Sequence, residues 1–217
     1  MDFWGDVMRR VTDIAVALIV AVLTLPLALL VAGAVRLSMG SPVLFRQQRS
    51  GYRGREFTIV KFRTMRAARY DGESDLGRDT PVGRLLRGLS LDEIPQLWNV
   101  LRGDMSLIGP RPTLPEQVRC YDQRQRGRLA VRPGITGWAQ VNGRNSISWP
   151  ERITLDLWYI EHRSVLLDLR ILWLTVVNVI RPHGVTAAGG VNPGFPQPAP
   201  VLDQPVPVPV PGAERSA

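Results

Sequence analysis

The chain has 217 residues, enough for one domain with a hydrophobic core. Its formal net charge of +8 predicts an anionic partner, such as a membrane surface, a nucleotide or a nucleic acid. With one cysteine, Cys120, and two histidines, His162 and His183, the composition argues against a disulfide framework, a zinc cluster and a histidine-activated nucleophile.

Residues 14–35 form an uncharged apolar segment between Asp13 and Arg36. As a helix this segment is about 33 Å long, which is enough to cross a bilayer core. Three interpretations compete. The segment is a spanning helix, a signal peptide cleaved near residues 32–34, or a re-entrant hairpin that enters and leaves the membrane on one face.

The residues in and around this segment favour the hairpin. Pro26 lies in the middle, where it removes a helical hydrogen bond, and the Thr24 hydroxyl is placed to satisfy the freed backbone group. The aspartates Asp2 and Asp6 weaken the signal-peptide interpretation. Both ends look cytoplasmic, because arginines flank both: Arg9 and Arg10 before, and Arg36, Arg46, Arg49, Arg53 and Arg55 after.

The pattern after the apolar segment begins with a β-hairpin. Residues 43–48 and 55–62 read as strands joined by a glycine-containing turn. Residues 66–79 read as a loop. Thr80 and Pro81 then offer an N-cap and a first-turn proline for a helix that ends near Arg87. Ser90 and Glu93 have the spacing of a capping box, which opens a helix with an apolar face of Ile94, Leu97, Trp98 and Leu101.

Further helices follow, with one more short strand. We expect a polar helix from residue 113 to about Leu129, a strand over residues 135–141, and a helix opened by Ser148 and Glu151. Residues 166–180 predict an apolar helix that lies either in the core or at a membrane interface. The expected units are a membrane hairpin (1–36), a cytoplasmic domain (37–180) and a proline-rich disordered tail (181–217). The expected fold class is α+β and mostly helical.

Two adjacent acids, Asp92 and Glu93, stand where a helix is expected to begin. A carboxylate there stays ionised, can attack phosphorus as a nucleophile, and can share a cation such as Mg²⁺ with its neighbour. The simpler interpretation is that Glu93 completes a capping box and Asp92 complements the helix dipole. The pair alone does not decide between these interpretations.

Stiffly held basic residues favour the catalytic interpretation. Arg111 lies between two prolines that restrict its backbone, and Arg87 lies just upstream of the acids. Lys61 is the only lysine, so it stands either where a compact charge is needed against a phosphate or by chance. Together with Arg132, Gln140 and Arg144, these residues indicate a diphosphate site with a metal at the edge of a membrane.

Several long motifs, in order, resemble one known family. They are SPVLFRQQRSGYRGREFTIVKFRTM, LSLDEIPQLWNVLRGDMSLIGPRP, VRPGITGWAQVNGR and LDLWYIEHRSVLLDLRIL. The chain resembles the bacterial sugar transferases over roughly residues 5–180. These are monotopic polyprenyl-phosphate phosphoglycosyl transferases, which start the assembly of exopolysaccharide, capsule, O-antigen or glycoprotein glycans.

The resemblance implies a reaction and its participants. Asp92 attacks the sugar-linked phosphate of a UDP-sugar and expels UMP, and polyprenyl (undecaprenyl) phosphate then takes the phosphosugar from the covalent intermediate. Asp92 and Glu93 hold Mg²⁺, and Glu93 acts as metal partner or as base. The family's helix is re-entrant and broken near a proline, at the cytoplasmic face of the bacterial inner membrane, with amphipathic interfacial helices around the site. The sequence leaves the oligomeric state open, with a homodimer among the candidates. Residues expected to hold phosphates are Lys61, Arg63, Arg87, Arg111, Arg132, Gln140 and Arg144.

Two other functions remain open from the sequence. A membrane-anchored basic lipid-binding protein without catalysis would explain the charge and the apolar segment, but it does not need Asp92. A phosphatase or pyrophosphatase with an aspartyl-phosphate would need no lipid acceptor. Nucleic acid is not an expected partner, because no RNA- or DNA-binding motif is recognised. The sequence does not specify the sugar.

Overall fold

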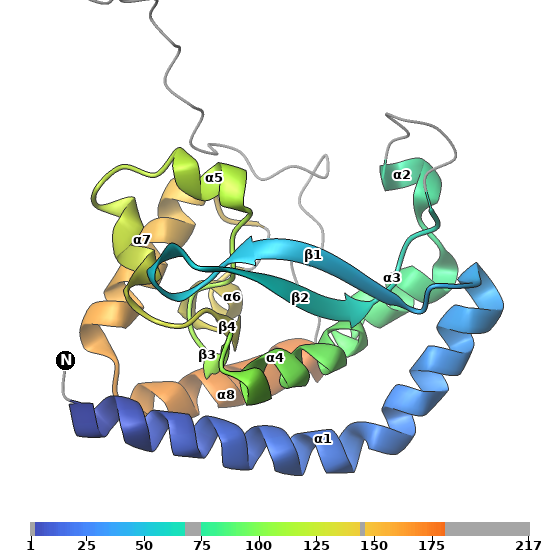
Figure 1. Ribbon diagram of the computed structural model, residues 1–217, viewed down its shortest axis with the longest axis horizontal. Helices are drawn as coiled ribbons and strands as arrows, with labels where there is room; N and C mark the ends of the chain where they lie inside the picture. Colours follow the sequence, from blue (N-terminus) through green and yellow to red (C-terminus); the bar gives the residue numbers. More distant parts are fainter. Residues whose placement is uncertain (1–2, 68–74, 144–145, 181–217) are drawn as a thin grey trace, which may run out of the picture.

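The computed structural model describes residues 3–67, 75–143 and 146–180. These residues form a mostly helical α+β fold with two small, separate two-stranded sheets, as Figure 1 shows. This agrees with the expected fold class and with its small hairpin. The predicted disordered tail, the candidate Arg144 and residues 68–74 of the predicted loop at 66–79 lie outside the described residues. The end of that loop prediction is wrong, because Asp75–Arg78 form the short helix α2.

The first helix, α1 (Phe3–Met39), forms one border of the molecule. In the described chain it is the one helix long and apolar enough to cross a membrane, and only 11% of its most apolar stretch is buried. Large apolar side chains therefore face outward along much of its length: Val7, Met8, Val11, Leu18, Ile19, Val22, Leu23, Leu25, Leu27, Leu29, Leu30 and Leu37.

Pro26 lies inside α1, and the helix continues through it. Figure 1 shows α1 bending in its second half, so the helix is bent instead of broken in two. The carbonyl that a proline frees is four residues earlier, here that of Val22. The predicted role of Thr24 is wrong, because its hydroxyl donates to the Val20 carbonyl at 2.7 Å. Such a back-bond still favours bending of a helix.

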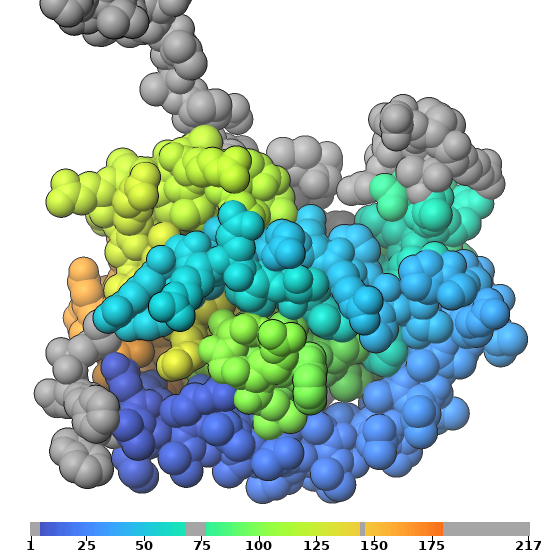
Figure 2. Space-filling model, in the orientation of Figure 1, coloured from blue at the N-terminus to red at the C-terminus, as the bar shows by residue number. Residues whose placement is uncertain are grey.

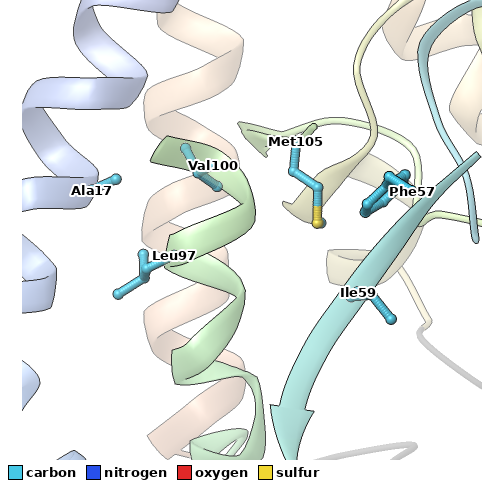
Figure 3. Close-up of a cluster of buried hydrophobic side chains, with 6 residues drawn as sticks. All are labelled: Ala17, Phe57, Ile59, Leu97, Val100 and Met105. Carbon is cyan, nitrogen blue, oxygen red and sulfur yellow. The ribbon is translucent and has the colours of Figure 1, made fainter. Parts of the chain in front are cut away.

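α1 packs against the rest of the described chain at two places. Near its middle, Ala17 is buried in one cluster with Leu97 and Val100, and Figure 3 shows these three side chains together. Near its end, Val31 and Val35 are buried in a second cluster with the hairpin and the helix that precedes the acidic pair. The apolar segment is thus an integral part of the fold, with one face buried and the other exposed.

The predicted hairpin is confirmed. β1 (Leu44–Ser50) pairs antiparallel with β2 (Glu56–Phe62), and the short 3₁₀ turn η1 (Tyr52–Gly54) joins them. The buried Asn99 of α4 (Leu97–Arg102) fastens β2 to that helix. Its side-chain amide accepts from the Val60 N–H at 3.1 Å and donates to the Thr58 carbonyl at 2.8 Å. Figure 2 shows α4 seated between the hairpin and α1.

The second sheet pairs two short parallel strands, β3 (Ser106–Ile108) and β4 (Gly134–Thr136). A Cβ added at Gly134 would lie 2.1 Å from the Gly109 nitrogen, so this close approach of two chain segments requires glycine. The predicted strand over residues 135–141 is correct only at its start. From Trp138 the chain forms the short helix α6 (Trp138–Val141), because the Val141 N–H bonds the Gly137 carbonyl at 3.0 Å.

The remaining elements surround these sheets. Two predicted helix starts are confirmed: the Thr80 hydroxyl accepts from the Gly83 N–H at 3.0 Å, and Ser148 and Glu151 form a capping box. The predicted long helix from residue 113 is wrong, because α5 ends at Arg119 and the buried Tyr121 follows it. These elements are α2 (Asp75–Arg78), α3 (Pro81–Gly88), η2 (Leu91–Gln96), α5 (Pro115–Arg119), η3 (Gln125–Ala130), α7 (Trp149–His162) and α8 (Val165–Ile180).

α8 is the apolar helix that the sequence left either in the core or at an interface, and most of its large apolar side chains are exposed. Ion pairs tie the α7–α8 corner to the start of α1: Arg9 bonds Asp168, and Arg163 bonds Asp6 at 3.2 Å. Exposed apolar residues on α8 are Val165, Leu166, Leu169, Leu172, Trp173 and Val176, and Leu85, Leu89 and Trp98 are exposed on or beside α3 and α4. The described surface thus carries far more exposed apolar area than scattered single residues would give.

Candidate active site

The acidic pair lies in the first turn of the 3₁₀ helix η2, and the regular helix α4 starts only at Leu97. The predicted capping box is wrong. Ser90 has a left-handed backbone (φ 57°, ψ 20°) and its hydroxyl makes no capping bond, whereas an N-cap residue normally has an extended backbone. The tight turn between α3 and η2 imposes this conformation. Without this capping box, the capping part of the simpler explanation for the acidic pair does not hold.

The two carboxylates have different surroundings. Glu93 accepts a charge-assisted hydrogen bond from Arg111 Nη2 at 2.7 Å. Asp92 is only 5% exposed. Burial and the neighbouring Glu93 charge raise the pKa of Asp92 to about 6, while Lys61 and Arg111 act in the opposite direction. Asp92 is therefore a buried carboxyl whose charge depends on nearby cations.

Both acids line one cavity of about 350 Å³. It also contains four other residues that the sequence indicated for ligand binding, which come from β2, α3, the loop after β3, and α6. The chain brings these groups together from positions up to 79 residues apart. The predicted residues on its wall are Lys61, Arg87, Asp92, Glu93, Arg111 and Gln140.

The cavity is lined by apolar as well as charged residues. The apolar residues include Val20 of α1 and Val179 of α8, together with Ile135 and Ala139. These two helices also carry much of the exposed apolar surface described above. A ligand in the cavity would therefore meet both cationic groups and the apolar helices.

Two of the cavity's polar side chains are placed to meet a ligand. Burial and the Arg111 charge lower the pKa of Lys61, whose ammonium lies 5.3 Å from the centre of the Phe45 ring. Both amide atoms of Gln140 are buried and have no hydrogen-bond partner within the described residues. Because a buried polar group without a partner is costly, Gln140 is suited to bind a polar ligand group.

Arg87 is held at the cavity by its own contacts. It pairs with Asp79, and its Nη1 donates to the Thr64 carbonyl at 3.3 Å. A close approach of the backbones supports this corner, because a Cβ on Gly83 would lie 1.8 Å from the Thr64 oxygen. The guanidinium therefore keeps a fixed position at the start of the turn that carries Asp92.

Two predicted residues within the described chain, Arg63 and Arg132, do not line the cavity. The buried Arg63 donates to the backbone carbonyls of Met39, Gly40 and Ser41 and so secures the end of α1. Arg132 donates from Nε to the Gly103 carbonyl at 3.0 Å. These contacts give both arginines a place in the fold, and a phosphate-binding role for them stays a prediction. Arg144 lies outside the described residues.

Sequence reasoning missed several residues of the cavity wall. Arg152 of α7 is 7% exposed, and its guanidinium lies 5.2 Å from the centre of the Trp149 ring. The hydroxyls of Thr136 and Thr175 are 2.7 Å apart, and Asn178 Nδ2 donates to the Val141 carbonyl at 3.1 Å. No local signal marked these residues. Arg152 is one arginine among many, and the two threonines and Asn178 are far from the acidic pair in the sequence.

The donor set fits a cation that is shared with a phosphate ligand. Among the described residues, no group of three or more His, Cys, Asp or Glu side chains could hold a metal alone. Asp92 and Glu93, however, are neighbouring carboxylates on the cavity wall. Mg²⁺ in phosphate-transfer enzymes is held by one or two carboxylates together with the substrate phosphates. A site of this kind needs no third acid from the protein.

Comparison with known proteins identifies the family. The model of the family described as "Bacterial sugar transferase" matches residues 4–182, which is most of the chain. The chain belongs to the bacterial sugar transferase family. This confirms the resemblance drawn from the motifs and makes the protein a transferase, so the non-catalytic lipid-binding interpretation no longer applies.

Three relatives illustrate the similarity. "Uncharacterized sugar transferase EpsL" of Bacillus subtilis (strain 168) is 47% identical over 190 residues, covering 86% of this chain and 94% of the relative. "Exopolysaccharide production protein ExoY" of Sinorhizobium fredii is 36% identical over 200 residues, covering 83% and 88%. "UDP-glucose:undecaprenyl-phosphate glucose-1-phosphate transferase" of Caulobacter vibrioides is 43% identical over 189 residues, covering 81% and 70%.

Proposed function

We propose that this sugar transferase moves a sugar 1-phosphate from a UDP-sugar to undecaprenyl phosphate and releases UMP, as the first membrane step of a surface glycan. One observation carries the proposal: a single cavity joins the buried Asp92 to a set of cations and to the apolar helices α1 and α8. The name of the Caulobacter vibrioides relative supports the same donor and acceptor classes and makes UDP-glucose the first donor to test.

In the first step, a carboxylate oxygen of Asp92 attacks the β-phosphorus of the UDP-sugar. The bond from that phosphorus to the bridging oxygen breaks, and UMP leaves with the electron pair. The phosphosugar is then held as an ester on Asp92. Burial of Asp92 suits this role, because a poorly hydrated carboxylate is a stronger nucleophile than a fully hydrated one.

In the second step, a phosphate oxygen of undecaprenyl phosphate attacks the same phosphorus, and the Asp92 carboxylate leaves. A phosphate monoester has a second pKa of about 6, so at neutral pH most of the acceptor needs no base to remove a proton. The 2.7 Å bond to Arg111 instead suits Glu93 to hold that arginine and to share a cation. We therefore assign Glu93 an orienting and metal-binding role.

The cations of the cavity supply the electrostatic part of catalysis. Lys61, Arg87, Arg111 and Arg152 all line the cavity that contains Asp92. Such groups stabilise the negative charge on the oxygens of the transferring phosphoryl group and of departing UMP. Asp92 and Glu93 would hold Mg²⁺, and the charge it supplies when bound would stabilise those oxygens further.

The exposed apolar surface supports a membrane position for the site. We propose that α1 is re-entrant and that α8 lies at the interface, on the cytoplasmic face of the inner membrane. Basic residues precede and follow the apolar part of α1, which favours the same side for both ends. A bend at Pro26 would allow the chain to turn back within the bilayer. The acceptor phosphate would then lie at headgroup level, beside the cavity.

The test is release of UMP by the purified protein in nanodiscs with Mg²⁺, undecaprenyl phosphate and a panel of UDP-sugars. We expect lipid-dependent turnover with one donor and, without lipid, a burst no larger than one UMP per active site. Sustained product release without lipid would indicate a pyrophosphatase. No UMP from any donor, by folded membrane-bound protein, would contradict the proposal.

The pH dependence follows from Asp92. Its pKa is raised to about 6 by burial and by Glu93, and only the ionised carboxylate can attack. We therefore expect kcat/KM for the donor to be nearly constant above that pKa and to fall about tenfold per pH unit well below it. A pH profile of the lipid-free burst rate checks this, because it reports only the first step. An acid limb near pH 4 would contradict it.

A further inference from the structure

A buried ion pair lies next to the cavity and is not part of its wall. Arg128 of η3 is 3% exposed and Asp156 of α7 is 1% exposed. The Asp156 carboxylate accepts a hydrogen bond from Arg128 Nε at 2.9 Å, and Arg128 Nη2 lies 2.6 Å from the same carboxylate oxygen. Taking two charges out of water costs free energy, so a buried pair is poor evidence of added stability. Its geometry instead indicates what it holds in place.

The remaining donors of Arg128 bind the Gly-Pro-Arg-Pro loop (residues 109–112) and two residues that follow it in the chain. Nη1 donates to the Thr113 hydroxyl at 2.9 Å and also to the hydroxyl of Tyr121. Nη2 donates to the backbone carbonyl of Arg111 at 3.2 Å. A guanidinium has five N–H donors in a rigid fork, and these contacts involve all three of its nitrogens. One side chain thus links α7 to the backbone of Arg111.

The hairpin holds the other side of this loop. The Ser50 N–H donates to the Thr113 carbonyl at 2.8 Å, and Arg49 Nη1 donates to the Pro112 carbonyl at 3.3 Å. The backbone at Arg111 is therefore secured by both β1 and Arg128. Its side chain leaves this support and reaches Glu93, with 42% of the side chain exposed at the cavity.

We propose that the Arg128–Asp156 pair is a positioning device that aims Arg111 at Glu93 beside the reacting carboxylate. Neither member of the pair lines the cavity, so neither touches substrate, and Arg128 makes the direct contact with the Arg111 backbone. The inference deepens the proposed function, and only its activity measurement rests on that function. A second measurement, the ionisation of Asp92, is independent of turnover.

The variant that isolates this role is Arg128→Lys. It keeps a positive charge for Asp156, but a single ammonium cannot reach Asp156, Thr113 and the Arg111 carbonyl together. Replacing Asp156 would be less selective, because its charge also acts on Arg152, one turn earlier on α7. The matched control is Tyr159→Phe, which removes a hydrogen bond to Asp168 at 2.8 Å from a buried residue of the same helix.

We expect folded Arg128→Lys to lose about 10- to 100-fold in kcat/KM, since a misplacement of about 1 Å can cost about 100-fold. The charged groups that act on Asp92 are Glu93, Lys61 and Arg111, and Arg111 lowers its pKa. Releasing Arg111 should therefore raise the Asp92 pKa above its wild-type value. A ¹³C carboxyl titration measures it, with the Asp92 signal assigned by its loss in Asp92→Asn. Tyr159→Phe should leave both quantities unchanged.

A wild-type kcat/KM and a wild-type Asp92 pKa in folded Arg128→Lys would overturn the inference. If that variant does not fold, Thr113→Val serves instead, because it removes one acceptor of the fork and should shift both quantities in the same direction by less. If kcat/KM and the Asp92 pKa of Thr113→Val both equal the wild-type values, the inference is overturned. If the wild type itself releases no UMP, the proposed function fails, and the titration alone decides the role of Arg128.

Discussion

Replacing Asp92 by asparagine should abolish both UMP turnover and the lipid-free burst while making the folded protein more stable. The activity loss follows from the proposed covalent step, because an amide is a far weaker nucleophile than a carboxylate. Removal of a nucleophile costs about 10,000-fold or more in other enzymes with covalent intermediates. The measurement is UMP release over the first turnover and at steady state.

The stability gain follows from the pKa of the same group. Burial and Glu93 raise the Asp92 pKa from 3.8 to about 6, so the folded protein binds this proton more tightly than the unfolded chain does. The stabilisation from that proton is present below pH 4 and is lost as the pH rises through 6. At neutral pH the ionised carboxylate therefore costs about 3 kcal/mol, which asparagine removes.

Thermal unfolding of both proteins checks this prediction, with a chelator present so that bound cations do not offset the charge. Asp92→Asn should unfold at a higher temperature at pH 7, and the difference should shrink towards pH 4. A misfolded variant would be less stable than the wild type. Loss of UMP release together with a higher unfolding temperature therefore shows that the chemistry is lost and the fold is kept. Substantial turnover in Asp92→Asn would remove Asp92 from the reaction and contradict the covalent step.

Local signals in the sequence predicted the elements that depend on neighbouring residues. The N-cap at Thr80, the capping box at Ser148 and the β-hairpin are confirmed because a cap or a tight turn is decided within a few residues. The apparent capping box at Ser90 is wrong for the opposite reason. Its left-handed backbone is set by how α3 and η2 pack, and nothing in the four-residue pattern reports that packing.

The candidate site likewise combines residues that local motifs marked with residues that only the fold brings in. The motifs marked Asp92, Glu93 and Arg111, and the structure places all three at one cavity. An arginine-rich composition, however, hides which arginine does what. Arg63 secures the end of α1, whereas Arg152 reaches the cavity from a helix that the sequence predicted without giving it a residue of the site. Such assignments depend on contacts between distant segments, which a single sequence does not display.

Arg111 is the second residue whose loss should be severe. Arg111→Ala removes a cation from the cavity wall, leaves Glu93 without its 2.7 Å partner, and removes a charge that lowers the Asp92 pKa. Loss of one such charge-stabilising group costs about 100- to 1,000-fold in kcat. The acid limb of the pH profile should also move to higher pH. The matched control is Arg102→Ala, an arginine of α4 that is 62% exposed and does not line the cavity.

The two effects of Arg111 can be separated with Glu93. If Arg111 acts partly by holding Glu93, then Glu93→Gln should cost less in an Arg111→Ala background than in the wild type, because the second change removes an interaction already lost. If the two residues act on substrate independently, their costs should add. Additive costs would show that the Arg111–Glu93 contact is incidental. A smaller combined cost would show that the contact itself serves catalysis, which is what its place beside the buried Asp92 leads us to expect.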